Sequence, residues 1–551
     1  MSKFHVTTRA LLASAALLGG GSAAAAPSLT LVGNVAAPSG VSEINAYDSF
    51  NNKLFSTHGT GLDVYDFNLG SNIATNAVPT IDLSSTFGLP ADFDGVSSVA
   101  VDPLGRGFGV ATVIPTANIT TLGKAVLFNT ATGAVITSVN AGYHPDMVTF
   151  TAGGDVLIAN EGERDTDIAQ PLGDAPGSIT RISFNGANAA TLTVNTNTTY
   201  DFTAGNLAGG VSLAGIRVAP DRVGTPHLDL EPEYISVTDG KAYVTLQENS
   251  AVGVFDLATN KWSAVHNIDG KVQTIDASDK DTGINIDDNV FGLFMPDAIA
   301  SYKTGGVTYY VTANEGDARD GSAGEEERIK DLNLADIDAA TVASLNALYG
   351  GNFQANDALG RLNVTTHDGN LDANAQIERL TMYGTRSFSI FDENGTLVYD
   401  SGSDFETITA AWNPAAFNSQ DSDLAEFESR SDNKGPEPEG VAITEFDGKT
   451  IVAVGLERVG GIMLYDVTDP NNPDFLQYIN TATFGNGAVG DKIGPEGLTF
   501  ISAADSPTGE TFLVVSYEDS GEIDVFTVVP EPSSLALLGL GSLLIARRRR
   551  G

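Results

Sequence analysis

The sequence predicts an all-β fold, a seven-bladed β-propeller with loop and helical insertions. Three observations support this prediction. Glycine occurs 60 times in 551 residues while charged residues make up 18%, a composition that suits many short strands separated by turns. Units of strand, turn and strand recur along the chain at a spacing of roughly 40–55 residues, and several of them show four strands. Five of these units also carry an acidic residue at each end of their first hairpin.

The first predicted elements are a leader and a closing strand. Residues 1–26 combine Lys3 and Arg9 with an apolar run and an Ala-rich end, which is typical of a secretory signal peptide. The propeller is expected over 27–528. Its first strand, at 28–36, would complete the last blade, because a ring closed in this way leaves no exposed sheet edge.

The repeated units follow in order. Two weaker units are at 42–67 and 96–129, and five stronger ones are at 145–161, 231–248, 296–315, 438–457 and 495–518. The unit at 296–315 is split, since 386–402 supplies its third and fourth strands after an insertion at about 316–385. That insertion contains a helical period at 331–350. Further insertions are expected at about 162–230 and at about 403–436.

The acidic residues of the five stronger units have a common place in their hairpins. Each first strand opens with Pro followed by Asp or Glu, and a second Glu follows the returning strand. An antiparallel hairpin returns the chain to its starting edge, so the members of each pair are expected side by side. If the blades surround one axis, these acids meet on one face. They are Asp146, Glu161, Glu233, Glu248, Asp297, Glu315, Glu439, Glu457, Glu496 and Glu518, with Asp317 nearby.

Carboxylates that gather on one face need compensation, because like charges raise one another's pKa. A bound divalent cation is one solution, with calcium expected first and magnesium as the alternative. Asn160, Asn249, Asn314 and backbone carbonyls would complete its shell. Ion pairs are the other solution, and shared protons a third. The available cations are Arg164, Arg319, Arg430, Lys434 and Arg458. The sequence leaves these alternatives open.

Two further motifs have chemical potential. The stretch 276–285, DASDKDTGIN, has the composition of a calcium loop but misses the EF-hand spacing. The clusters ANEGERD at 159–165 and ANEGDARD at 313–320 place an Arg close to an acidic residue that could bind a metal ion. Such pairs suit phosphoester hydrolysis, in which the metal polarises the phosphate and the Arg grips it. An Arg that pairs with its own Glu is the simpler interpretation. We found no nucleophile elbow, phosphate-binding loop or dinucleotide motif, so catalytic residues stay unassigned.

The bulk charge excludes one class of partner. The formal net charge is −41 at pH 7, whereas nucleic-acid binding requires clustered Lys and Arg. The chain has no Cys, so disulfides and thiolate zinc sites are impossible. The acidic balance suits a secreted protein, a cation-binding protein, or both.

Several strings resemble one known family. PDMVTF, ANEGERD, EPEYISV, ANEGDARD, RSDNKGPEPEGV and GPEGLTFISAADSPTGE are similar to motifs of the choice-of-anchor I family, over about residues 40–528. The resemblance implies a secreted or surface-displayed propeller. Some members of that family are labelled alkaline phosphatase, and others cell-surface glycoprotein.

The C-terminal segment, 529–551, resembles the PEP-CTERM sorting signal of Gram-negative bacteria. Pro530-Glu531-Pro532 precedes an apolar stretch and four Arg residues. The resemblance implies an exosortase-like protease as a partner and a transient inner-membrane anchor at 535–550, the membrane contact expected of this chain.

Two functional hypotheses result. The first is a binding or adhesion module at the cell surface or in the extracellular matrix, stabilised by a divalent cation, with a polysaccharide as a candidate ligand. The alternative is a metal-dependent extracellular phosphoesterase that uses the same acidic face.

Overall fold

The computed structural model describes residues 26–67, 80–162, 164, 175–319, 324–372, 374, 376–484 and 492–530. The predicted signal peptide and the predicted anchor at 535–550 lie outside these residues. The chain divides into two units, of which Ser28–Val529 is the larger. The following description concerns this unit.

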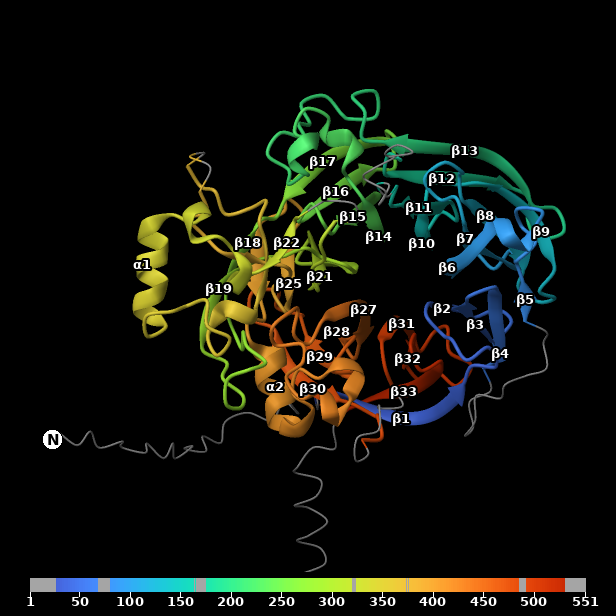
Figure 1. Ribbon diagram of the computed structural model, residues 1–551. Helices are drawn as coiled ribbons and strands as arrows, with labels where there is room; N and C mark the ends of the chain where they lie inside the picture. Colours follow the sequence, from blue (N-terminus) through green and yellow to red (C-terminus); the bar gives the residue numbers. More distant parts are fainter. Residues whose placement is uncertain are drawn as a thin grey trace, which may run out of the picture. The chain divides into compact units, whose positions relative to one another are not determined.

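Seven four-stranded antiparallel sheets make up most of the described chain (Figure 1). The first three are β2 (Asn45–Asp48), β3 (Lys53–His58), β4 (Gly61–Asp66) and β5 (Ile81–Asp82); β6 (Phe93–Val101), β7 (Phe108–Pro115), β8 (Lys124–Asn129) and β9 (Val135–Asn140); and β10 (Pro145–Phe150), β11 (Val156–Asn160), β12 (Ser178–Asn185) and β13 (Thr193–Asp201).

The fourth and fifth sheets are β14 (Pro232–Thr238), β15 (Lys241–Leu246), β16 (Ala251–Asp256) and β17 (Lys261–Asn267); and β20 (Ile299–Thr304), β21 (Val307–Asn314), β25 (Ser387–Asp392) and β26 (Leu397–Asp400). The sixth and seventh are β27 (Pro438–Phe446), β28 (Lys449–Leu456), β29 (Ile462–Asp466) and β30 (Asp474–Ile479); and β31 (Pro495–Ile501), β32 (Phe512–Tyr517), β33 (Glu522–Pro530) and β1 (Pro27–Ala36).

The sheets close into a ring. The first strand of each sheet contacts the first strand of the next, in the order β2, β6, β10, β14, β20, β27, β31 and back to β2. Figure 1 shows these innermost strands around the middle of the ring. In the seventh sheet the order is β1-β33-β32-β31. The predicted propeller fold and the closing N-terminal strand are therefore confirmed.

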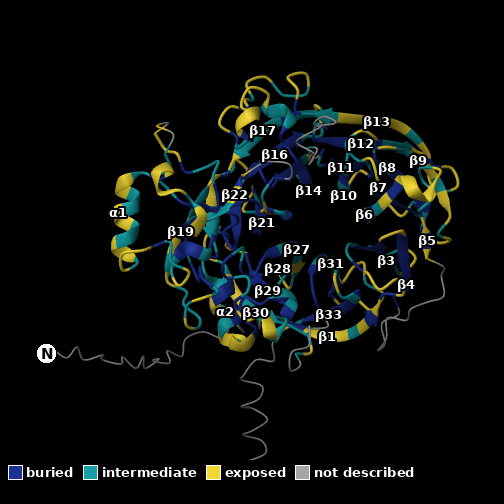
Figure 2. Cartoon of the chain, viewed as in Figure 1, coloured by how far each residue is buried: buried dark blue, intermediate teal, exposed yellow. Residues whose placement is uncertain are grey.

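Burial changes from the inner to the outer strands. Second strands such as β3, β11 and β32 are buried along nearly their whole length, because neighbouring sheets cover both of their faces. Outer strands such as β9 and β13 are mostly exposed, and Figure 2 shows the exposed residues of β13 at the rim. This position explains the continuous apolar runs in the second strands.

Three segments extend beyond the ring. Between β21 and β25 lie β22 (Glu326–Arg328), α1 (Ala339–Leu348), β23 (Asn363–Thr365) and β24 (Thr381–Met382). Asp338 caps α1 through a hydrogen bond from the Thr341 amide. The second segment, between β26 and β27, contains α2 (Asp404–Trp412). In the third, β18 (Gly270–Ile275) and β19 (Asp288–Leu293) form an extra sheet with β24.

The prediction of one insertion over 162–230 is wrong in part. Ser178–Asn185 and Thr193–Asp201 are β12 and β13, which complete the third sheet. β13 reads TVNTNTTYD and is mostly exposed. Its polar composition, which suggested a loop, is that of an outer strand with one solvated face, where Thr is favourable. The remainder, between β13 and β14, does leave the sheet.

Candidate functional site

Four first strands share a β-bulge directly after their opening proline. Pro145 pairs with Asn160, but the next paired residue is Val148. The same register shift follows Pro232, Pro438 and Pro495. A bulge re-aims the side chains within it. The residues at these bulges include four of the predicted acids, namely Asp146, Glu233, Glu439 and Glu496.

An unusual backbone conformation precedes four of the five opening prolines. The residue before the opening proline has a positive φ at His144 (42°), Met295 (42°), Glu437 (56°) and Gly494 (67°). This conformation is strained for residues other than glycine. Glu437 is held there by an ion pair with Arg430. The same strained backbone conformation therefore recurs at this end of several sheets.

Glycine lets neighbouring first strands approach one another. A Cβ atom added at Gly440 would lie 2.2 Å from the carbonyl oxygen of Glu496, and one added at Gly497 would lie 2.2 Å from that of Glu43. Only glycine fits such contacts. The Pro-Glu-Gly steps of β27 and β31 thus place Glu439 and Glu496 on closely packed neighbouring strands.

Five acids converge at this end, and we call Asp146, Glu233, Asp297, Glu439 and Glu496 the channel ring. Burial raises the pKa of Glu233 well above its ordinary value, and Asp297 and Asp146 add to the effect. The pKa of Glu439 is raised by burial and then by Glu457, Glu496 and Asp297. Asp146 and Asp297 likewise raise the pKa of Glu496, after burial, Glu43 and Glu518. Acids from five sheets therefore share one electrostatic environment.

The channel ring has little compensation. Among the described residues, Glu233, Asp297, Glu439 and Glu496 form no ion pair. One carboxylate oxygen of Glu233 and one of Glu439 are buried without a hydrogen-bond partner. The hydroxyl of Tyr234 donates to Glu496 Oε1 at 3.3 Å. A buried polar atom without a partner is costly, so these oxygens are poised to accept a ligand.

A cavity of about 380 Å³ adjoins the ring. Residues of all seven first strands line it, including Tyr234 on β14, Ile299 on β20 and Glu496 on β31. Most of its wall is apolar and formed by β2, β6 and β10. Of the five ring acids, Glu496 lines this central cavity.

The second glutamates lie where the hairpins predicted, just beyond the residues paired with the opening prolines. Their surroundings differ from one another. Glu161 lies 3.2 Å from Nδ1 of His144. Burial raises the pKa of Glu248 to about 7 although Arg319 opposes the shift. The pKa of Glu518 is raised by burial and by Asp519, against the effect of Arg458.

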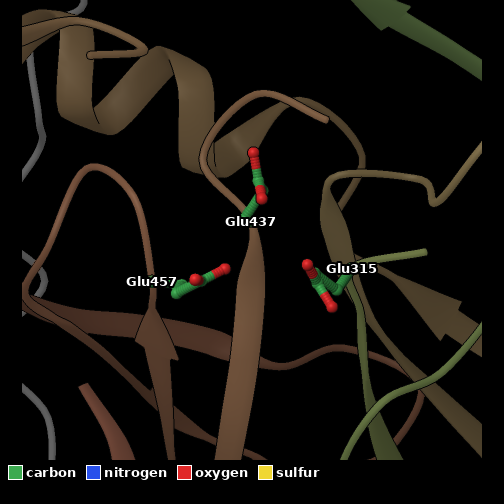
Figure 3. A group of neighbouring side chains, drawn as sticks. All are labelled: Glu315, Glu437 and Glu457. Atoms are coloured by element: carbon green, nitrogen blue, oxygen red, sulfur yellow. The ribbon is translucent and has the colours of Figure 1, made fainter. Parts of the chain in front are cut away.

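Glu315 and Glu457 belong to a compact trio with Glu437 (Figure 3), which we call the paired triad. Their ligand oxygens lie within 4.8 Å of one another, the only acidic trio of this kind among the described residues. Lys434 Nζ lies 2.7 Å from Glu315, 3.8 Å from Glu437 and 3.6 Å from the exposed Asp317. Arg458 is 2.5 Å from Glu457. With Arg430 on Glu437, three cations face three buried carboxylates.

The five predicted clamp cations all have acidic partners. Arg164 pairs with Asp221 at 2.5 Å. Arg319 is buried and its Nε lies 2.9 Å from Asp229. The other three, Arg430, Lys434 and Arg458, contact the glutamates of the paired triad. The ion-pair alternative therefore describes this part of the acidic face, and the cations expected to grip a phosphoester are engaged with carboxylates.

Sequence reasoning missed three acids and one tyrosine. Glu43 precedes β2, and its pKa is raised to about 8 by burial, Glu518 and Asp146. Glu231 and Glu437 were passed over as ligand candidates, although both stand two residues before a predicted acid in Glu-Pro-Glu steps. The sequence feature that could have identified Tyr234 is its position next to Glu233. Glu43 had no such feature, because its unit lacks the opening proline.

Comparisons with known proteins agree with this architecture. The model of the choice-of-anchor I domain matches residues 43–470, and that of the PEP-CTERM protein-sorting motif matches residues 528–550. The sorting motif implies export, recognition by the exosortase machinery and surface sorting in a Gram-negative bacterium. Within the described residues, neither helix is long and apolar enough to cross a bilayer.

Two curated proteins are similar to parts of the chain. Gigasin-3a of Magallana gigas is 32% identical over 184 residues, which cover 31% of this chain and 64% of that protein. The mesenchyme-specific cell surface glycoprotein of Strongylocentrotus purpuratus is 29% identical over 228 residues, which cover 36% of this chain and 29% of that protein. The matches thus span less than two thirds of either relative.

Solved structures with a similar fold include the β-propeller domain of Myceliophteria thermophila Cps50 (Swd1) and the hydrazine synthase of Kuenenia stuttgartiensis. The first has 8% identity and a TM-score of 0.41, covering 91% of this chain and 100% of the other. The second has 10% identity and a TM-score of 0.44, covering 90% and 98%. The family model spans more than half of the sequence and covers four of the five acids of the channel ring, all except Glu496. The chain belongs to the choice-of-anchor I family.

Proposed function

We propose that this exported surface propeller is a binding module that takes up a divalent cation, calcium first, at the channel ring. The observation that carries the proposal is the pair of buried carboxylate oxygens of Glu233 and Glu439 that have no partner. Oxygen ligands of this kind suit calcium and magnesium. A bound cation would offset the mutual repulsion that raises the pKa of each ring acid.

The spacing of the ring indicates how the cation is held. The described residues bring three acidic ligand atoms within 4.8 Å only at the paired triad. At the ring, water would therefore fill several positions of the coordination shell. Water-filled positions are also replaceable by oxygen atoms of a ligand.

A cation at this place would explain how so acidic a chain binds a surface polymer. The net charge of −41 repels acidic polysaccharides. A divalent ion with open positions can bridge the ring to a ligand carboxylate or sulfate. We propose such cation-dependent binding as the adhesion role, with the segment 535–550 as the transient inner-membrane anchor before sorting.

The phosphoesterase alternative has weaker support. Its proposed clamp residues, Arg164 and Arg319, pair with Asp221 and Asp229. An ester would have to displace these carboxylates. Turnover of a model phosphate ester by the mature protein with calcium, magnesium or zinc would favour this alternative over a binding module.

The test is a calorimetric calcium titration of the mature protein after chelator treatment. Glu233→Gln combined with Glu439→Gln removes the two oxygens that lack partners, while Glu510→Gln removes an exposed acid elsewhere. We expect the double variant to bind one calcium fewer and the control to match the unchanged protein. Equal stoichiometry in all three, or no binding in any, would overturn the proposal.

A further inference from the structure

A second group of carboxylates lies outside the channel, in the connection between β18 and β19. Asp276 and Asp281 come from this connection, and Glu428 comes from the segment between β26 and β27. Asp276 is fully buried and Glu428 is 4% exposed. Two segments far apart in the sequence therefore bring acids together in a buried place.

Asn285 fixes the conformation of the connection. Its backbone amide donates to Asp276 Oδ2 at 2.7 Å. Its side-chain amide donates to Asp281 Oδ2 at 2.9 Å and to the Gly283 carbonyl at 3.0 Å. Gly283 itself has a φ of 90°, which favours glycine. The loop is therefore folded around its two aspartates by its own residues.

The Arg and Lys side chains near this group form ion pairs with other acidic residues. Arg361 binds Asp279 at 2.8 Å, and Lys280 binds Asp279 too. Arg386 binds Glu406 at 2.7 Å. In the part of the chain that the structure describes, Asp276, Asp281 and Glu428 form no ion pair.

Two oxygens of the group are left over. Glu428 Oε1 and Asp281 Oδ1 are buried and have no hydrogen-bond partner. The charged neighbours of Glu428 are Asp276, Asp281 and Asp279, all in the connection, and together with burial they raise its pKa to about 7. Hydrogen bonds also join the two segments, because Arg386 donates to the Asp276 carbonyl at 2.8 Å and to the Ser431 carbonyl, three residues after Glu428, at 2.7 Å.

We propose that Asp276, Asp281 and Glu428 hold a second divalent cation of the calcium type. Hard oxygen donors and a fully buried Asp suit this ion, with backbone carbonyls and water in its remaining positions. A cavity of about 500 Å³, lined by Asp281, Asp287, Asp288 and Asp357 among others, provides an acidic entrance. The proposal does not rest on the channel ring.

The bound ion would fasten one segment to another. Asp276 and Asp281 belong to the connection between β18 and β19, whereas Glu428 belongs to the segment that leads into β27. That same segment supplies Glu437 of the paired triad and its partners Arg430 and Lys434. The second cation would therefore hold in place the loop that neutralises the triad.

A tyrosine near the entrance allows the site to be observed. The hydroxyl of Tyr349 donates to Asp288 Oδ1 at 2.7 Å, and both residues line the acidic cavity. Terbium, which replaces calcium at oxygen sites, emits when a nearby tyrosine is excited. Tyr234 would report on the channel ring in the same way.

The experiment is a terbium titration of full mature protein carrying Glu233→Gln and Glu439→Gln, so that the channel ring is disabled. We expect one remaining terbium site, whose emission is lost in Tyr349→Phe without a change of affinity and persists in Tyr234→Phe. Adding Asp281→Asn and Glu428→Gln should weaken terbium binding at least tenfold. Calcium should also protect the segment 403–436 from limited proteolysis in the background with intact Asp281 and Glu428.

Three results would overturn the proposal. They are the absence of a terbium site in the first background, unchanged affinity after Asp281→Asn with Glu428→Gln, and unchanged emission in Tyr349→Phe. If the combined variant fails to fold, Asp281→Asn alone gives the same decision, because Asp281 is only partly buried. Failure of the channel proposal would leave these readouts unaffected.

Discussion

The channel ring and the paired triad lie at the same end of the propeller and both consist of acidic residues, yet they differ in how many cations contact them. In the triad, Lys434, Arg430 and Arg458 contact Glu315, Glu437 and Glu457. In the ring, Glu233 and Glu439 each keep a buried oxygen without a partner. The glutamates of the triad therefore have cationic partners, whereas Glu233 and Glu439 of the ring do not.

The difference arises from the loops rather than from the repeat. Each repeated hairpin supplies an acid at its opening and a glutamate at its end. The stretch RSDNKGPEPEG adds one glutamate of the triad, Glu437, and two of its cationic partners, Arg430 and Lys434, at the entry into β27 alone. A buried carboxylate is stable only when paired, so the compactness of an acidic trio does not identify a metal site. A buried carboxylate oxygen without a partner is the better indicator of such a site.

Removal of the lysine should have the largest effect. Lys434→Met leaves three buried carboxylates with two cations, and breaking a buried ion pair costs about 3–5 kcal/mol. We expect a loss of this order in the free energy of unfolding, measured with denaturant. Lys303→Met is the matched control, since Lys303 pairs with an exposed aspartate and should change nothing measurable. Equal effects of the two variants would show that the triad does not depend on pairing.

The pH dependence of the metal-free protein should be the next largest effect. The pKa of Glu43 is raised from 4.5 to about 8 and that of Glu248 to about 7. The folded state therefore binds more protons than the unfolded state between pH 5 and 8. The resulting stabilisation is complete below about pH 4.5 and is lost as the pH rises through 7 and 8.

Melting curves in chelator at pH 5.5 and pH 8 test this expectation. The protein should melt at the higher temperature at pH 5.5, and calcium should remove most of the difference. A metal-free protein that is more stable at pH 8 would show that ion-paired carboxylates, rather than Glu43 and Glu248, control the pH response.

Neutralising one acid should distinguish the two groups by sign. Glu439→Gln removes a repelling charge from the ring, so the metal-free protein should gain about 1–2 kcal/mol at pH 8. Glu437→Gln removes the carboxylate partner of Arg430 and should lose stability. Denaturant titrations of both variants in chelator measure the change in the free energy of unfolding. Changes of the same sign would show that the ring and the triad do not differ in the way described.

The smallest effect is expected at Tyr234. Tyr234→Phe removes one hydrogen bond to Glu496, a loss of about 0.5–1.5 kcal/mol in unfolding free energy. Because no ring carboxylate is removed, calcium affinity should change less than in Glu233→Gln. A larger loss of affinity in Tyr234→Phe would make the hydroxyl, rather than the acids, the main determinant of binding.

Much of the ring could be predicted from the sequence, because a hairpin returns Glu161 to Asp146 and Glu248 to Glu233 whatever the details of the loop. The opening prolines also mark where the bulges begin. β24 could not be foreseen, since it joins its sheet through parallel pairing of Phe291 and Gly292 with residues 90 positions away. Nor could the position of Lys434, which depends on how an irregular loop crosses to Glu315, 119 residues earlier.

Anomalous diffraction from crystals of the mature protein soaked in terbium tests the central claim most directly. We predict a peak bordered by the carboxylates of Glu233 and Glu439 and none at Glu315, Glu437 and Glu457, where Lys434 already supplies the positive charge. A peak at the paired triad, or a channel ring without one at saturating terbium, would contradict the account.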